Sequence, residues 1–425
     1  MILLLISLTV LLLLGIPIAY ALGMASAVYF LLVQPELLPV LPQRLFAGMQ
    51  SYALIALPLF IFMGQVMNHS GITRRLLDLC LLLVGRLPGG LGMVNVSSSM
   101  LFGGISGSST SDTASIGSVL IPEMKRRGYP LSYASGITVA SSTMGMILPP
   151  SIPIVLYAVA AQASVGKLFL GGIIPGLLVG TLQLVMAVWI SRRKNYPRES
   201  AEWSWQKGGS MILRSVHILF MPVFIVGVVV FGIATATESA ALGVLYALCI
   251  GVFFLRQLTF KQLYTSLLTA AHTSAQIMII IAFSQVFVWI LALERAPENL
   301  TAWILELKLS PTQLLLLIVC GVLIIGTVID VSPAILLLTP IFLPAITGAG
   351  ISPILFGVVF VAALAVGACT PPVGTCLNVC ALISGQRIGT IFMGAVPFLS
   401  ANVAALFLMI LFPELVLWLP RLFMP

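Results

Sequence analysis

Residues 103–115 read GGISGSSTSDTAS, a run of small and polar residues inside a strongly apolar chain. These 13 positions hold five serines, two threonines and Asp112, and long apolar stretches lie on both sides. At the depth of a membrane, irregular polar backbone is tolerated only where protein buries it or where it lines a water-filled cavity. The stretch therefore predicts an interruption of helical structure that serves a buried polar site.

The composition predicts an all-α protein that crosses a membrane many times. Of 425 residues, 60% are hydrophobic and 8% are charged, and the mean hydropathy is +1.16. Soluble domains carry about a quarter charged residues, whereas apolar runs of about 20 residues can each cross a hydrocarbon core of roughly 30 Å. The net charge of +8 comes from short basic clusters between apolar runs, a pattern typical of cytoplasmic loops that does not indicate nucleic-acid binding.

The N-terminal apolar run, residues 1–33, lacks the basic segment with which a signal peptide begins. We expect an uncleaved first membrane helix with a bend at residues 15–17. The six cysteines fall in apolar segments, where they are expected to be small apolar side chains.

The chain resembles itself at an offset of 222 residues, and the matches are mostly glycine and proline. Gly104 corresponds to Gly326, Gly145 to Gly367, and the pair Pro149-Pro150 to the pair Pro371-Pro372. Glycine and proline dictate backbone shape, and a fixed period indicates repeated structural units. The offset predicts two halves with one fold, each with a helix broken at its double proline.

The charges around the two repeats differ, which predicts that the repeats have opposite orientations in the membrane. The first polar hairpin is flanked by six basic residues, which are Arg74, Arg75, Arg86, Lys125, Arg126 and Arg127. Its counterpart is flanked by Arg295 and Lys308, diluted by three glutamates. Basic loops tend to stay in the cytoplasm, so the hairpins should enter from opposite sides, as in the inverted repeats of many secondary transporters.

We predict nine full crossings and four parts of the chain. Residues 1–90 should form scaffold helices and an arm helix (74–89), and residues 193–311 should form central scaffold helices, a cytoplasmic loop and a second arm helix (257–272). Residues 91–192 should form a first transport repeat, with hairpin 91–122 and broken helix 130–160. Residues 312–425 should form a second transport repeat, with hairpin 312–345 and broken helix 352–382.

Each hairpin tip is expected to lie opposite one broken helix. Broken helices free backbone carbonyls that can bind Na⁺, and the N-termini of half-helices favour an anionic substrate. Small residues also allow tight helix packing in membranes, and a single double proline can be a simple kink. Two such elements at one offset favour a binding site over packing.

Three acids, Asp112, Glu238 and Asp330, lie within apolar segments, where an ionisable group costs roughly 2.5–3.5 kcal/mol at the bilayer centre. Asp330 is expected to shape an ion or substrate site, and Glu238 to cap a helix. For Asp112 two readings stay open, a cap of the returning half-helix or a site residue. Arg295 either pairs with the adjacent Glu294 or meets an incoming carboxylate.

Five motifs give the sequence its resemblance to a known family. They are GGISGSSTSDTASIGSVLIPEM (103–124), ILPPSIPIVLYA (147–158), TATESAALGVLYA (235–247), GTVIDVSPAILLLTPIFLP (326–344) and TPPVGTCLNV (370–379). Together they resemble the large membrane subunit of a tripartite ATP-independent periplasmic (TRAP) transporter over nearly the whole chain. One departure is Ala236, where the family usually has proline.

The resemblance implies an elevator-type transporter with inverted repeats and two re-entrant hairpins. It also implies import of an organic acid (sialic acid, a C4-dicarboxylate or a sugar acid), driven by Na⁺. The expected partners are a periplasmic binding protein, a separate small four-helix membrane subunit and phospholipid. The expected location is the bacterial inner membrane, with the N-terminus in the cytoplasm.

The resemblance also implies roles for individual residues. A first Na⁺ site would use Ser106, Ser108, Ser109 and Gly145, and a second would use Thr327, Asp330, Gly367 and Thr370. The residues that the resemblance places at the substrate are Ser111, Ser151, Thr375 and Asn378, and the charges considered above add Asp112 and Arg295 as candidates.

Two alternatives stay open at the level of sequence. One is a stand-alone Na⁺-coupled carboxylate transporter of related fold, and the other is a membrane scaffold subunit that does not transport. An enzyme is not expected, since the sequence carries no recognisable catalytic triad, metal-binding cluster or nucleotide-binding loop.

Overall fold

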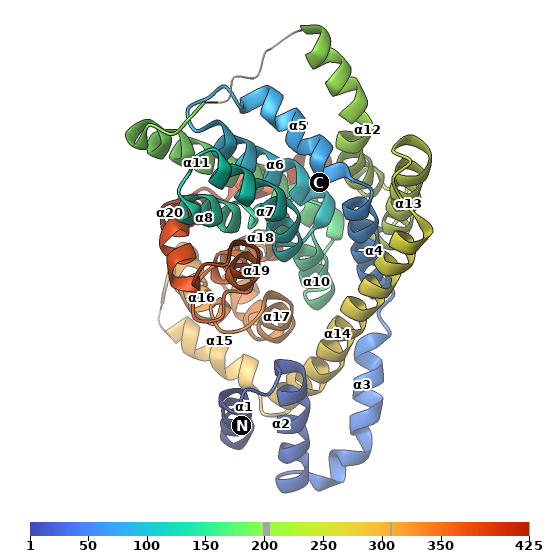
Figure 1. Ribbon diagram of the computed structural model, residues 1–425. Helices are drawn as coiled ribbons and strands as arrows, with labels where there is room; N and C mark the ends of the chain where they lie inside the picture. Colours follow the sequence, from blue (N-terminus) through green and yellow to red (C-terminus); the bar gives the residue numbers. More distant parts are fainter. Residues whose placement is uncertain (199–204, 307, 425) are drawn as a thin grey trace.

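A computed structural model describes residues 1–198, 205–306 and 308–424, and this part of the chain is helical without a β-strand (Figure 1). Residues 199–204 of the basic loop predicted to be cytoplasmic lie outside the described residues. The first helices are α1 (Ile2–Leu13), α2 (Ile18–Leu32), α3 (Leu41–Met49), α4 (Ala56–His69) and α5 (Ile72–Val84), with short 3₁₀ turns at Pro35–Val40 and Tyr52–Ile55.

The predicted first membrane helix is interrupted where the sequence places its glycine and proline. Gly15 has a positive φ of 79° and Pro17 precedes α2, so α1 and α2 are separate helices of 12 and 15 residues. At 1.5 Å per residue, each is shorter than the hydrocarbon core is thick.

The polar stretch lies between two helices, α6 (Gly90–Ser106) and α7 (Ser109–Arg126). Gly107, which joins them, has φ +63°, and a Cβ atom there would lie 3.0 Å from the Pro150 carbonyl oxygen. Glycine adopts this conformation without steric cost. The chain can therefore reverse direction at this position and still pack against the first double proline.

The helix after α7 is broken at the double proline, as predicted. It comprises α8 (Leu131–Ser141), α9 (Met144–Ile147) and α10 (Ile152–Ala160), with a bend of 43° between Leu131–Ile147 and Ile152–Ala160. The backbone N–H of Ile152 donates to the carbonyl of Gly107 at 3.2 Å. The break and the turn between α6 and α7 are therefore in direct contact. α11 (Val165–Lys194) follows.

The C-terminal part has a corresponding set of helices. These are α16 (Pro311–Gly326), α17 (Val331–Gly348), α18 (Pro353–Gly367), α19 (Thr375–Ser384), α20 (Ile388–Leu411) and α21 (Glu414–Phe423). The backbone N–H of Val373 donates to the Thr327 carbonyl at 3.1 Å, so this break also contacts the turn of its helix pair. Both double prolines have a cis peptide bond.

The central helices are α12 (Trp205–Val230), α13 (Ala236–Cys249), a π-helical turn at Ile250–Phe254, α14 (Phe260–Leu293) and α15 (Ala296–Glu306). The prediction of a second arm helix at 257–272, separate from the next crossing, is wrong. α14 is one helix of 34 residues that begins with a capping box at Thr259. No glycine or proline occurs between Phe260 and Leu293, so nothing in this segment interrupts the helix.

Within the described residues, six helices are long and apolar enough to cross a membrane, or seven if the bent helix 131–160 counts as one span. Nine crossings were expected. Two expected spans, 2–33 and 352–382, are divided into shorter helices, and the apolar helix described for the expected span 211–231 is the shorter segment Ser215–Val230. One helix that is long and apolar enough, α17, lies in the expected second hairpin.

The two halves pack against each other through their broken helices. α8 packs along α20 and α7 along α19, while α14 lies against α2, α3, α4 and α17. In Figure 1, α14 runs as a long diagonal past the group formed by α7, α8, α18 and α19. This arrangement brings both interrupted regions to the side of the group that faces α14.

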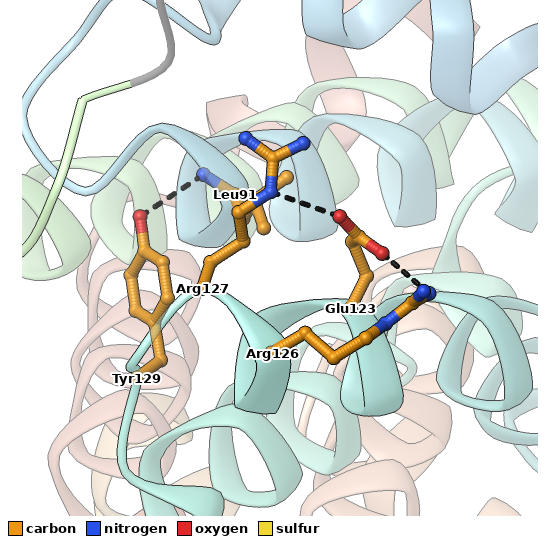
Figure 2. A network of polar contacts seen from close by, with 5 residues as sticks. All are labelled: Leu91, Glu123, Arg126, Arg127 and Tyr129. Atoms are coloured by element: carbon orange, nitrogen blue, oxygen red, sulfur yellow. Dashed lines mark hydrogen bonds and ion pairs between the residues drawn. The ribbon is translucent and has the colours of Figure 1, made fainter.

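A polar network fixes the end of the first helix pair that is remote from its turn (Figure 2). Glu123, near the end of α7, accepts from Arg127 at 2.9 Å and pairs with Arg126 at 2.5 Å. The Leu91 backbone N–H, at the start of α6, donates to the Tyr129 hydroxyl at 3.4 Å. With 17 residues in α6, this network lies about 25 Å along the helix from the turn.

Candidate functional site

A cavity of about 200 Å³ lies where the turns of both helix pairs meet. The first pair contributes Gly107, Ser108 and Thr110, and the second contributes Asp330, Val331 and Ser332. Met146, Ile152 and Pro153 of the first broken helix complete that side, while α4 and α14 provide the opposite wall through Ile61, Thr273, Gln276, Ile277 and Ile280. Segments more than 200 residues apart in the chain therefore form one cavity, whose lining combines polar and apolar side chains.

Three helices begin at this cavity. The lining residues include the first turns of α7, α10 and α17. The N-terminus of a helix carries partial positive charge, and any unpaired backbone N–H groups there favour an anion. At α10 the N–H groups are engaged, because Ile152 donates to the Gly107 carbonyl, Pro153 has no N–H, and Ile154 donates to the Ser151 hydroxyl, so this helix contributes its dipole alone. Asp330 is the one charged side chain among the described lining residues. An anion in the cavity would therefore meet helix N-termini and neutral hydrogen-bonding groups, with the Asp330 carboxylate as the one like charge beside it.

Asp112 lies behind the cavity, in the first polar cluster. Its side chain is 0% exposed, and its Oδ1 accepts a hydrogen bond from Ser106. Its Oδ2 has no hydrogen-bond partner among the described residues. A Cβ atom at Gly145 would lie 2.7 Å from this oxygen. Because a buried carboxylate needs a compensating charge or hydrogen bonds, this cluster has the chemistry of a cation site.

The helix-cap reading of Asp112 is wrong. α7 begins at Ser109 with Ser108 at its N-cap, so Asp112 lies within the first turn of the helix. Its backbone N–H donates to the Ser108 carbonyl at 3.0 Å, as in ordinary helix. The side chain of Asp112 is therefore directed to Ser106 and Gly145 rather than to the helix end.

The other predicted members of the first ion site lie around the same turn. The Ser106 hydroxyl, which donates to Asp112, accepts a hydrogen bond from the Ser108 backbone N–H at 3.3 Å. Ser109 is buried, and its hydroxyl accepts the thiol hydrogen of Cys376 at 3.1 Å. This contact joins α7 to α19 of the other half, and sequence alone gave no reason to pair these residues.

The second polar cluster surrounds a cavity of about 10 Å³, which is close to the size of one water molecule. Its lining is Gly326, Ile329, Asp330, Ala368, Val373, Gly374 and Thr375. The Thr375 hydroxyl is buried next to the Asp330 carboxylate. An oxygen-rich cavity of this size next to a carboxylate suits a single hard cation, which prefers oxygen ligands.

The other residues predicted for this ion site have different surroundings. Thr327 and Thr370 donate their hydroxyls to carbonyls of their own helices, at 2.8 Å to Ile324 and 2.9 Å to Val366. Gly367 packs against Gly326, where a Cβ atom would lie 2.7 Å from the Gly326 Cα. Thr375 was predicted to face the substrate and instead lines the small cavity beside Asp330.

Three residues predicted to contact substrate are engaged within the protein. Ser111 accepts from the amide of Asn68 on α4 at 3.0 Å. Ser151 donates to the Met146 carbonyl and caps α10. Asn378 is exposed and donates to the Val373 carbonyl at 2.9 Å.

Arg295 lies well away from the cavity. Arg295 lies just beyond the C-terminal end of α14, 15 positions after the lining residue Ile280. At the helical rise per residue, the two residues are separated by about 22 Å along the helix axis. The neighbouring Glu294 accepts a hydrogen bond from Tyr29 of α2. The third acid of the apolar segments, Glu238, forms a capping box with Thr235, as predicted.

Two cavity residues on α14, Thr273 and Gln276, were not predicted. The available signal was their polarity within a long apolar helix whose best window has a mean hydropathy of 2.3. Single polar residues in such a helix do not reveal which way they face. Their place in the cavity depends on the packing of α14 against α17 and α4.

A larger cavity of about 390 Å³ lies elsewhere, between α6, α11 and α12, and its lining is apolar. It includes Met100, Leu148, Leu170, Pro222 and Val226. Such a lining offers contact to hydrocarbon and no group that would bind a polar solute, so the smaller polar cavity is the candidate transport site.

Interrupted helices that meet at a buried cavity are typical of membrane transport proteins. The chain is similar in fold to the crystal structure of the YdaH transporter of Alcanivorax borkumensis, with a TM-score of 0.64, 15% sequence identity and coverage of 92% of this chain and 95% of that one.

The chain belongs to the DctM component family of tripartite ATP-independent periplasmic transporters, whose model matches residues 5–415. It is 33% identical to the 2,3-diketo-L-gulonate TRAP transporter large permease protein YiaN of Escherichia coli, over 95% of both chains. It is 34% identical to the C4-dicarboxylate TRAP transporter large permease protein DctM of Pseudomonas aeruginosa, in an alignment that covers 94% of both chains. It is also 34% identical to the sialic acid TRAP transporter large permease protein SiaM of Vibrio cholerae, in an alignment that covers 96% of both chains. The chain is thus a transporter component and not an enzyme.

Proposed function

We propose that this chain is the large transmembrane subunit of a Na⁺-driven TRAP transporter that imports an organic acid into the bacterial cytoplasm. The observation that carries this proposal is the 200 Å³ cavity, at which three helix N-termini meet and beside which two oxygen-rich clusters lie. Helix N-termini favour the acid's carboxylate. The relatives named for C4-dicarboxylate and sialic acid support an organic acid as the substrate.

Na⁺ is the coupling ion in this proposal. Asp112, with Ser106 and Gly145, would hold one ion, and Asp330 with Thr375 would hold the other. The uncompensated Oδ2 of Asp112 and the buried hydroxyl of Thr375 beside Asp330 support these sites, because each is a buried oxygen that a cation would stabilise. Ions bound on the far side of the helix turns would add positive charge next to the carboxylate in the cavity.

The two helix pairs are proposed to be re-entrant hairpins of an inverted repeat, carried by a transport domain that moves as an elevator. Each pair contacts its own double-proline break through one backbone hydrogen bond. α14, which packs against α2, α3 and α4, would belong to the scaffold. This scaffold would be completed by a separate small membrane subunit, with phospholipid around both, in the inner membrane. The N-terminus would lie in the cytoplasm.

The proposal is tested by uptake into proteoliposomes that contain this chain and its small membrane partner. A periplasmic binding protein loaded with its radiolabelled acid is supplied outside, with an inward Na⁺ gradient. We expect uptake that needs the binding protein and the Na⁺ gradient, and a loss of at least about tenfold for Asp330→Asn. The matched control is Asp78→Asn, on the exposed side of α5. Equal uptake when K⁺ replaces Na⁺ would contradict Na⁺ coupling.

A stand-alone transporter would show the same Na⁺ dependence without the binding protein or the small subunit. Uptake of the free acid by this chain alone would therefore favour that alternative.

A further inference from the structure

The wall of the cavity formed by α14 carries two polar side chains, Thr273 and Gln276. They are three positions apart, so they lie on one face of the helix, next to the lining residues Ile277 and Ile280. Gln276 is exposed within a helix that is otherwise apolar enough to cross a membrane. A polar side chain at that depth is stable when it faces water or a polar ligand rather than lipid.

The chemistry of this wall complements that of the opposite side. A glutamine amide offers two N–H donors and a carbonyl acceptor, and a threonine hydroxyl can donate and accept. The side formed by the helix pairs presents helix N-termini, which favour negative charge. The described lining includes no lysine or arginine, so neutral donors on α14 are the side-chain groups available to an acid's second polar end.

The volume of the cavity suits a small acid. A protein cavity of about 150 Å³ can hold a benzene molecule, which has six non-hydrogen atoms, so a 200 Å³ cavity suits a ligand of about eight. A four-carbon dicarboxylate, with about eight non-hydrogen atoms, is of this size. A nine-carbon sugar acid, with roughly twenty, exceeds it more than twofold.

We propose that Gln276 and Thr273 are specificity-determining residues that bind the second polar end of a small acid, of about four carbons, with oxygen atoms at both ends. This inference rests on the proposed function of the same cavity. The first carboxylate lies at the N-termini of α7 and α17, and the far oxygens accept from the Gln276 amide and the Thr273 hydroxyl. An acid without oxygens at that end leaves the amide unpaired, which disfavours its binding.

The test uses a reporter cysteine on the opposite wall, so that the α14 residues stay intact. Ser332→Cys is made in a chain that also carries Cys249→Ser and Cys320→Ser, because Cys320 is exposed and Cys249 is partly buried. The purified complex in Na⁺ buffer is treated with a small polar thiol reagent. The probes are succinate, butyrate and N-acetylneuraminate, and the measured quantity is the probe concentration that halves the labelling rate.

We expect succinate to protect the reporter at a concentration at least about tenfold lower than butyrate. We expect N-acetylneuraminate not to protect it. Gln276→Ala should raise the half-protecting succinate concentration about tenfold and remove the preference over butyrate, since one hydrogen bond to a charged group contributes on that scale. The matched control is Gln285→Ala. Gln285 is nine positions further along α14, on the opposite face, where its side chain lies against Gly48.

The labelling rate without ligand reports whether each variant is folded. If succinate protects the reporter and Gln276→Ala leaves the half-protecting succinate concentration unchanged, the proposed role of Gln276 in binding the acid is contradicted. If N-acetylneuraminate protects better than succinate, the size limit is wrong. If no acid protects the reporter in Na⁺, the proposed function itself fails.

Discussion

Replacing Asp112 with asparagine separates the need for a cation from the need for a well-packed side chain. Asp112 is fully buried, one of its oxygens is bonded to Ser106, and the other has no partner within the described residues. Asparagine has the same shape and no charge. If a Na⁺ ion belongs beside Oδ2, then Asp112→Asn removes both the binding site and the unfavourable burial of an uncompensated carboxylate.

The magnitudes follow from these two effects. An unsatisfied buried charged group costs about 1–3 kcal/mol or more, so we expect the Na⁺-free variant to be more stable than the wild-type protein by about that amount. In the wild-type protein, Na⁺ at ten times its dissociation constant stabilises the folded state by about 1.4 kcal/mol per site. The variant should lose this contribution from the first site.

The assay is thermal unfolding of the purified complex in choline chloride and in sodium chloride at equal ionic strength. The prediction is a higher melting temperature for Asp112→Asn in choline and a smaller rise when sodium is added. Asp78→Asn, on α5, is the matched control and should keep the full sodium-dependent rise. A variant that is less stable in choline and keeps the wild-type rise in sodium would refute the reasoning, because it would show that Asp112 acts without a bound cation.

Three further predictions concern the second cluster and the orientation of the chain. Thr375→Val keeps the shape of the side chain and removes the buried hydroxyl beside Asp330, so the sodium-dependent thermal shift should fall. Thr347→Val, whose hydroxyl is bonded within its own helix, should leave the shift unchanged, and equal shifts in both variants would argue against Thr375 as a ligand. Gly367→Ala places a Cβ atom 2.7 Å from the backbone of α16. The melting temperature or the yield of folded complex should therefore fall by an amount equivalent to about 1–3 kcal/mol. A melting temperature equal to that of the wild-type protein would show that α16 and α18 separate freely. Single cysteines at Arg126 and Gly348 should be labelled by an impermeant thiol reagent from opposite sides of the membrane, and labelling from one side would rule out the inverted repeat.

The interruptions of the helices could be predicted because they are encoded locally. Gly107 and the two double prolines impose backbone conformations that ordinary helix does not allow, and the chain bends or turns at each of them. The capping role of Glu238 was predictable for the same reason, since Thr235 lies three residues before it.

The parts of the site that come from distant helices could not be predicted. Gln276 and Thr273 reach the cavity through the rotation of α14 about its axis, which packing against α4 and α17 determines. The environment of Asp112 likewise depends on Gly145, which belongs to a different helix. Sequence indicated an acid near a helix start, and only the packing of α7 against the broken helix distinguishes a buried site residue from a cap.

The central claim is that the turns of the two helix pairs meet at one cavity. The direct test is cross-linking of the double variant Ser108→Cys and Ser332→Cys, whose positions line the cavity from the first and the second pair. We predict that a short bis-maleimide joins the two cysteines within one chain, seen as a single intramolecularly linked peptide pair by mass spectrometry, and that Na⁺ with the transported acid slows this reaction. Efficient single labelling of both cysteines without cross-linking, under all conditions, would contradict the claim.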